Sequence, residues 1–270
     1  MPNEGAIQNG RIEQASEASG PVDLTVGEWH DPEDDASRVV ASEKDGFLCH
    51  ISLRRRWAIE PSAVFRILTN PDNSKIFRDI YSVPYRKVLE DDGQGRQVVE
   101  VEQASGFKFL IIPILFRTRL IVEQDEQALT MSFRLARRGT MKEFRGVWTL
   151  VPAYEEGPGG ERRASGTIAT MEQDVLPAFV PPFFARVLRG ISVNACRRVV
   201  QDVDEVVERV RAGEALQDLL DRGIKGVPRA AAGGKTGVAD GAGNVASFPV
   251  AAGDTCTSEE EDSPRVGTTG

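Results

Sequence analysis

The sequence is poor in the residues that build metal centres and disulfide frameworks. It contains three cysteines and two histidines among 270 residues. Cys49, Cys196 and Cys256 are widely spaced and odd in number, which argues against a disulfide scaffold and against a cysteine-based zinc site. Two histidines cannot supply a three-histidine zinc centre. We therefore expect no metal, no other cofactor and a reducing compartment.

Long apolar runs are also absent. No stretch of about 18 apolar residues occurs, so no segment of the sequence is predicted to span a bilayer. The N-terminus is acidic and lacks the basic stretch and apolar core of a secretory signal, and a transit peptide would be poor in acidic residues. These absences favour a cytoplasmic protein or one at the periphery of a membrane.

Acidic residues outnumber basic ones: the sequence has 41 Asp and Glu and 33 Lys and Arg, which gives a net charge of −8. The excess acid lies at the ends of the chain. Residues 1–45 have few large apolar groups, and residues 223–270 combine Gly, Ala and Thr with a "SEEED" run. Neither segment can bury enough apolar surface to offset the conformational entropy that it would lose on folding. We therefore predict two disordered tails around one domain over residues 46–222. That domain is only mildly basic, and we expect no nucleic-acid partner.

The hydrophobic pattern of residues 46–222 predicts one strand, two short helices, six strands and one long helix. Alternating apolar residues from Phe47 to Leu53 indicate the first strand. "EPSAVFRIL" and "NPDNSKIF" both have proline where a helix starts. The pattern predicts further strands over 82–90, 96–107, 114–123, 128–135, 142–152 and 164–174. From Pro181 to about Ala212, apolar residues recur at three- and four-residue steps, which is typical of an amphipathic helix.

This order of elements predicts an α+β protein. Sequential strands with short connections form an antiparallel meander, and a seven-stranded sheet twists and curls. The long helix must cover the concave face, because nothing else in the domain can. We expect an apolar cavity between the curled sheet and the helix.

Several segments resemble those of a known superfamily. The stretches are "NPDNSKIFRDIYSVPYRKVLEDDG", "VVEVEQ", "MKEFRGVWTLVP" and "VPPFFARVLRGI". They are similar to segments of the START-like, helix-grip superfamily, which includes polyketide cyclase-like and lipid-transport proteins. The resemblance is strongest to the coenzyme Q-binding START-like family and an uncharacterised plant branch near it, and it covers about residues 47–212.

The resemblance implies a ligand and a second possible compartment. It implies non-catalytic binding or transfer of a hydrophobic small molecule, either a lipid or a prenylated quinone, and it suggests a mitochondrion or plastid as an alternative location. The residues themselves indicate only an apolar lining. We expect the ligand to contact inward-facing side chains of the sheet and the long helix: Phe109, Ile111, Phe116, Leu120, Met131, Phe133, Trp148, Met171, Phe183, Phe184, Leu188, Ile191 and Ala195.

The stretch "LPAFVPPFFARVLRG" predicts a gate where the long helix begins. The stretch has three phenylalanines close to the start of the helix, which is unusually apolar for such a place. Its prolines reduce the conformational entropy that the segment loses on folding. "FKFLIIPILF" at residues 107–116 either is buried on both faces or forms a hairpin tip at the cavity mouth. Lys and Arg residues flank both stretches, so we expect transient contact with a membrane surface. We expect the protein to be a monomer.

Polar candidates for catalysis are few. Strand alternation places Glu143 and Arg145 on one face of "KEFRGVW" and its aromatic residues on the other, and we favour an outward-facing ion pair. Glu100 and Glu102 are expected on an exposed face. His50 faces away from the apolar side of its strand and has no visible partner, so we predict no catalysis. A cyclase or aromatase remains the alternative if Glu143, Arg145 or Tyr154 points inward, and a protein-interaction module if the cavity is filled.

Overall fold

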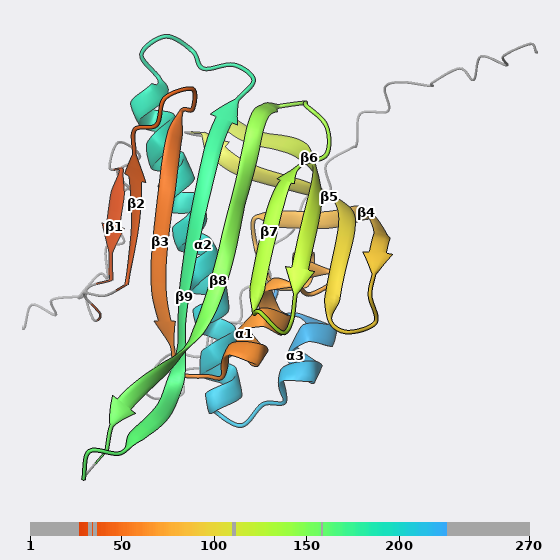
Figure 1. Cartoon of the computed structure of the whole chain (residues 1–270). Helices are drawn as coiled ribbons and strands as arrows, with labels where there is room; N and C mark the ends of the chain where they lie inside the picture. Colours follow the sequence, from red (N-terminus) through yellow and green to blue (C-terminus); the bar gives the residue numbers. More distant parts are fainter. Residues whose placement is uncertain (1–26, 32–33, 35–36, 110–111, 158, 226–270) are drawn as a thin grey trace, which may run out of the picture. The chain divides into compact units, whose positions relative to one another are not determined.

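The computed structural model describes residues 27–31, 34, 37–109, 112–157 and 159–225, with the side chains of residues 107–115 left aside. The described residues form one antiparallel sheet and three α-helices (Figure 1). The strands are β1 (Glu28–His30), β2 (Arg38–Ser42), β3 (Cys49–Trp57), β4 (Ile80–Asp91), β5 (Arg96–Phe109), β6 (Ile112–Asp125), β7 (Thr130–Leu135), β8 (Met141–Glu156) and β9 (Arg162–Pro177). The helices are α1 (Pro61–Leu68), α2 (Ala185–Arg211) and α3 (Leu216–Arg222).

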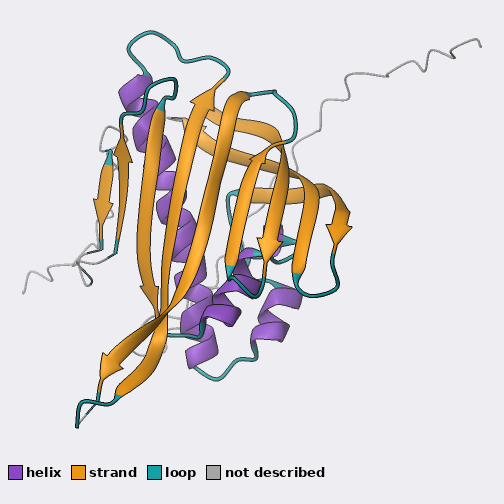
Figure 2. Ribbon diagram, in the orientation of Figure 1, coloured by secondary structure: helices purple, strands orange, loops and turns teal. Residues whose placement is uncertain are grey.

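The sheet is a meander that the first strands extend. Its strand order is β1-β2-β3-β9-β8-β7-β6-β5-β4, so the hairpins from β4 to β9 are neighbours in sequence and in space. Pairing of β3 with β9 joins strands that are more than 100 residues apart in the chain. The strands curl around α2, which crosses one face of the sheet (Figure 2). This arrangement confirms the α+β, helix-grip prediction.

Helix α2 is held by one apolar stripe. Val200, Val203 and Val206 are fully buried, and they recur at three-residue steps, which keep neighbouring side chains on one side of a helix. The stripe belongs to the main core, together with Val39 of β2 and Ile51 of β3. Burial of these side chains fixes α2 against the β1–β3 side of the sheet, at about 25 cal/mol for each Å² of apolar surface.

A second, smaller cluster lies on the other half of the sheet. Its buried members are Val101, Leu120 and Val122, with Met131 and Phe133 packed against them. Met131 and Phe133 also pack against the main core, so they connect the two clusters. Residues of both clusters border the cavity described below.

The structure corrects the strand count and the domain boundaries. Nine strands are described rather than seven, because β1 and β2 lie within the segment that we assigned to a disordered tail. Val39 of β2 is fully buried and packs in the core, a contact that sparse apolar residues in an acidic segment did not reveal. At the other end, the buried Ile224 extends the domain slightly beyond residue 222, where α3 ends.

The connection after α1 also differs from the prediction. "NPDNSKIF" forms a single 3-10 turn at Asn73–Lys75 instead of a helix. The side-chain oxygen of Asn70 accepts a hydrogen bond from the backbone N–H of Asp72, so it caps a turn that does not continue. The hairpin predicted near Pro113 is present, with Phe109 paired to Ile112 across its tip.

Candidate functional site

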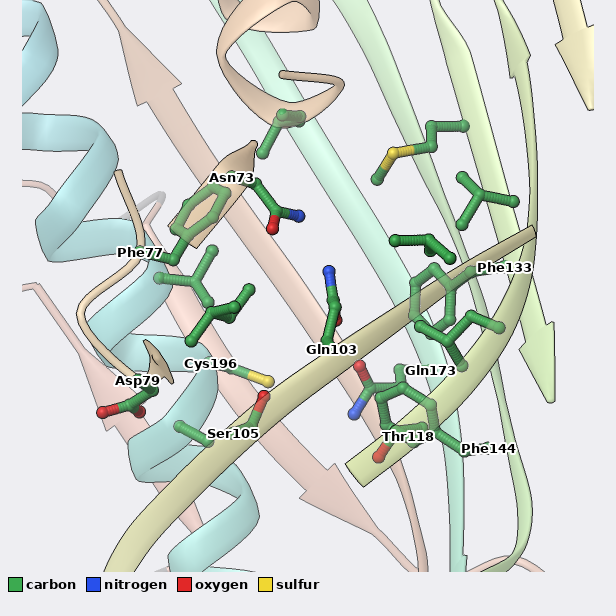
Figure 3. Close-up of a pocket in the computed structure, with 18 of the residues that line it drawn as sticks. Asn73, Phe77, Asp79, Gln103, Ser105, Thr118, Phe133, Phe144, Gln173 and Cys196 are labelled. Carbon is green, nitrogen blue, oxygen red and sulfur yellow. The ribbon is translucent and has the colours of Figure 1, made fainter. Parts of the chain in front are cut away.

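A cavity of about 340 Å³ lies between α2 and the curled half of the sheet. Its walls come from β4 to β9, from the middle of α2 and from the connection between α1 and β4. Figure 3 shows side chains from these elements facing a common space. The volume is within the range of small-molecule sites, which start at about 300 Å³.

Most of the cavity wall is apolar. Strand alternation turns Val99, Val101, Leu120 and Val122 inward, and an aromatic group completes the sheet side of the wall. Phe133 packs directly over the backbone of Gly146, where an added Cβ would lie 2.6 Å from its ring. The Phe133 and Phe144 rings are 5.2 Å apart. Glycine at position 146 therefore lets two aromatic side chains share the wall.

Eight of the residues predicted to contact a ligand line this cavity. They are Phe116, Leu120, Met131, Phe133, Trp148, Met171, Ile191 and Ala195. Leu188 is not among the wall residues and packs against the main core instead, because the first turns of α2 lie beyond the cavity. Ile111 lies outside the described residues, and Phe109 lies in β5 at a position whose side chain is outside the described part.

The predicted gate residues do not line the cavity. Phe183 is fully exposed, and Phe179 and Phe184 are exposed as well. Phe183 has a φ of 67°, a left-handed conformation that is uncommon for an aromatic residue and turns the chain sharply into α2. Val180 does pack against the core. This corrects the placement of Phe183 and Phe184, which lie on the surface near the helix start.

Neutral polar side chains interrupt the apolar wall, and several of them come from the strands. Gln103 and Ser105 come from β5, Thr118 from β6 and Gln173 from β9 (Figure 3). Gln103 and Ser105 continue the inward face that Val99 and Val101 begin. The alternation of "VVEVEQ" puts Gln103 on the same face as Val99 and Val101, whereas Gln173 becomes a neighbour only through pairing of distant strands. Together these groups can donate and accept hydrogen bonds inside the cavity.

Charged side chains lie at the end of the cavity near α2. The guanidinium group of Arg198 donates to the carboxylate of Asp79, and both residues belong to the wall. Asp202, also in the wall, accepts a backbone N–H bond of 2.8 Å and a guanidinium bond of 2.6 Å, both from Arg78. Burial raises the pKa of Asp202 to about 6, against the lowering effect of Arg78. The sequence does not reveal these pairs, because the two partners of each pair lie more than 100 residues apart in the chain.

The "KEFRGVW" strand has its aromatic face inward, as favoured. Phe144 and Trp148 line the cavity, and Arg145 lies outside it. Arg145 pairs with Asp174 of β9 at 3.0 Å rather than with Glu143, which lies 3.8 Å from Arg138. Tyr154 is half exposed and outside the cavity wall. None of the three residues that would favour a cyclase points inward.

Asp174 organises a charged group on the outer face. Its carboxylate accepts hydrogen bonds from Lys44 at 2.7 Å and from Arg145 at 3.0 Å, and it lies 2.8 Å from the Nδ1 atom of His50. Burial alone would raise the pKa of Asp174, but these partners outweigh burial and lower it to about 2. His50 thus has carboxylate partners that the sequence did not show, since Glu172 also lies 2.8 Å from its Nε2 atom.

The thiols near the site are unreactive. Burial raises the pKa of Cys196, in the cavity wall, to about 12, and burial raises the pKa of Cys49 to about 11. Both thiols stay protonated at neutral pH and are poor nucleophiles. Among the described residues, no group of His, Cys, Asp and Glu is arranged to hold a metal ion, and no helix is long and apolar enough to cross a bilayer.

Comparison with known proteins adds a domain family and several solved structures. A family model described as a domain of unknown function, DUF220, matches residues 38–158. No curated protein matches the sequence. The helix-grip fold follows from the sheet order and from the long helix α2 that the sheet curls around (Figure 2).

Three of the similar solved structures are bacterial. TTHA0849 from Thermus thermophilus has 15% identity and a TM-score of 0.41, covering 61% of this chain and 99% of that one. A START superfamily protein from Mycobacterium smegmatis has 11% identity and a TM-score of 0.42, covering 60% and 98%. The ZhuI aromatase/cyclase from Streptomyces sp. R1128 has 18% identity and a TM-score of 0.42, covering 62% and 98%.

Proposed function

We propose that this protein binds a hydrophobic small molecule in the cavity and carries it without changing it chemically. The observation that supports this most is the composition of the wall. Apolar side chains from the sheet and α2 surround a space of about 340 Å³, and polar groups, most of them neutral, interrupt them. Such a site favours a molecule with a hydrocarbon body and one or two hydrogen-bonding groups. A lipid and a prenylated quinone both have this chemistry.

Binding is proposed to draw its free energy from apolar burial. Each methylene group moved from water into the cavity contributes about 0.8 kcal/mol. Gln103, Thr118 and Gln173 would orient the ligand, because an amide or hydroxyl left unpaired against a ligand costs about 1–3 kcal/mol. The apolar part of the wall is therefore proposed to provide the affinity, and its polar groups the specificity among ligands of similar size.

The exposed phenylalanines are proposed to serve delivery at a membrane surface. Phe179 and Phe183 are among the most exposed large apolar side chains of the described residues. They lie on the segment that leads into α2, near the loop before β8, because the N–H of Ala178 bonds to the carbonyl of Thr140. Arg138 and Lys142, two residues on either side of Thr140 in the sequence, are exposed as well. Exposed aromatic and cationic side chains in one region suit the interface of a bilayer.

A catalytic function is the second candidate, and one observation favours it. Asp202 lies in the cavity wall, and burial raises its pKa to about 6, a value suited to a general acid or base at neutral pH. Asp79 and Arg198 are close by and could polarise a ligand carbonyl. If the protein is an enzyme, Asp202→Asn should abolish turnover of the bound molecule without releasing it.

The test uses Nile red, a neutral dye whose emission shifts to the blue in apolar surroundings. We expect saturable binding to the full chain at a stoichiometry of about one. Ala195→Trp should abolish the signal, because the indole would occupy the cavity. Ser165→Trp, at a position outside the cavity wall, is the matched control and should bind as the parent does. Equal dye binding by the parent and the Ala195→Trp variant would contradict the proposed site.

A further inference from the structure

A second hollow, of about 270 Å³, lies on the other face of the sheet, where arginines gather. Its charged wall residues are Glu102, Arg117, Arg119, Arg137 and Arg138. Strand alternation puts Glu102 on the outer face of β5, because Val101 and Gln103 on either side of it line the apolar cavity. Glu102 is nevertheless buried, which corrects the prediction that this face of β5 is exposed.

The buried carboxylate of Glu102 gathers three guanidinium groups. It lies 3.2 Å from Arg137, 3.6 Å from Arg117 and 3.9 Å from Arg119. Arg119 is fixed further by Glu100 at 3.0 Å and by the Tyr85 ring, whose centroid is 3.8 Å from the guanidinium carbon. These contacts hold the positive charges close together before any ligand arrives.

The arginines outnumber the carboxylates that hold them. Arg138 lies 3.8 Å from Glu143, so four arginines share three glutamates and one positive charge is in excess. Arg117 and Arg137 share the single carboxylate of Glu102, and their side chains are 69% and 66% exposed. Each guanidinium group has five N–H donors, so both retain donors for a further oxyanion.

The hollow adjoins the apolar cavity at the place where β7 stops. β7 ends at Leu135, which pairs with Leu120 of β6, whereas β6 begins eight residues earlier at Ile112. Beyond Leu135 a loop, rather than a strand, leads to β8. Thr118 of β6 and Met141 of β8 each belong to the walls of both the hollow and the cavity. The two sites are therefore neighbours across the end of β7.

We propose that this hollow binds the phosphate group of a lipid whose hydrocarbon chain occupies the apolar cavity. Arginine suits phosphate because its planar donors match two oxygens at once. The proposal rests on the proposed function and adds a ligand class, an anionic phospholipid, to it. Thr118, which touches both spaces, lies where the polar group and the chain of such a lipid meet.

The test compares two lipids that differ only in the phosphate. We use 1-oleoyl lysophosphatidic acid and 1-oleoylglycerol as monomers to displace Nile red from the full chain. The parent protein should release the dye at an about tenfold lower concentration of the phosphate lipid, and added salt should shrink this preference. Arg117→Gln/Arg137→Gln should remove the preference while 1-oleoylglycerol binds as before. Arg54→Gln/Arg163→Gln removes the same charge from exposed positions outside the hollow and should keep the preference.

The outcomes separate this proposal from the proposed function. If neither lipid displaces the dye, the proposed function fails. If both lipids bind equally to the parent protein, or if Arg117→Gln/Arg137→Gln keeps the preference, the cavity binds lipid but the phosphate site is overturned. A third arm uses vesicles containing phosphatidic acid. If the double variant loses vesicle binding but keeps the preference for monomeric phosphate lipid, the arginines contact the bilayer instead, and the proposal is wrong.

Discussion

The two halves of the sheet have similar apolar inner faces but different surroundings. On β2 and β3, Val39 and Ile51 press against α2 and are fully buried. On β5 to β7, Val101 and Leu120 form a separate small cluster, and Met131 and Phe133 face a cavity. Inward apolar residues that pack against α2 on β2 and β3 belong to the core, whereas those on β5 to β7 border the cavity. The predictions below compare the packed half with the open half.

Shortening an inward-facing side chain should destabilise the two halves of the sheet to very different extents. Ile51→Ala removes a fully buried side chain from the packed half and should lower the free energy of unfolding by about 2–5 kcal/mol. Met131→Ala should cost less than about 2 kcal/mol, because Met131 already borders empty space. Urea unfolding of both variants measures the difference. Equal losses would mean that the open half is packed as tightly as the other.

Enlargement should give the opposite contrast. Ala169 is fully buried in the main core, and Ala195 lines the cavity. Ala169→Trp forces an indole into a filled space and should lower the free energy of unfolding by about 1–3 kcal/mol or more. Ala195→Trp should change it by less than about 1 kcal/mol, since the cavity admits the ring. The melting temperatures of the two variants measure this contrast. A lower melting temperature for Ala195→Trp than for Ala169→Trp would contradict a cavity at Ala195.

Two aspartates should respond to pH in opposite directions. The pKa of Asp202 is raised to about 6, so its protonation stabilises the fold below about pH 4, and this contribution is lost as the pH rises through 6. The pKa of Asp174 is lowered to about 2, so its contribution is present above about pH 4 and is lost as the pH falls through 2. Each contribution is on the order of 2–3 kcal/mol.

Asparagine variants make this test specific. Asp202→Asn should gain stability relative to the parent protein as the pH rises from 4 to 7. Asp174→Asn should be less stable than the parent above pH 4 and should approach it towards pH 2. Urea unfolding across this range measures both differences. A flat difference for Asp202→Asn would show that its environment does not penalise the carboxylate.

The exposed aromatic residues should matter least for stability. Phe183→Ser should change the free energy of unfolding by less than about 0.5 kcal/mol, because the side chain is fully exposed. It should nevertheless slow transfer of a pyrene-labelled lipid between vesicles. Tyr81→Ser, at another exposed aromatic residue, is the matched control and should transfer normally. If both variants transfer at the parent rate, Phe183 has no role in delivery.

Local patterns predicted most of the fold. Alternation located β3 to β9, and the valine stripe of α2 located the long helix. The missed parts depend on tertiary contacts. β2 is stabilised by the burial of Val39, which a window dominated by acidic residues conceals. The second short helix stops after one turn because its backbone bonds go to Asn70 and neighbouring turn residues.

The site was predictable only where it follows strand or helix periodicity. Met131, Phe133 and Trp148 could be placed in the wall because inward residues alternate along each strand. Gln173 and Asp202 could not be placed in this way, since they reach the cavity through pairings between distant segments. The prediction placed the Phe183 side chain at the cavity, whereas its positive φ turns it to the surface. A positive φ is uncommon for phenylalanine, so the sequence gives no sign of it.

Native mass spectrometry of the full chain, purified from the cell that makes it, tests the central claim most directly. The parent protein should carry an additional non-protein mass that organic solvent releases, and Ala195→Trp, expressed in the same cell, should lack it. The account would be contradicted by a parent protein free of any bound mass, or by the same mass on both proteins.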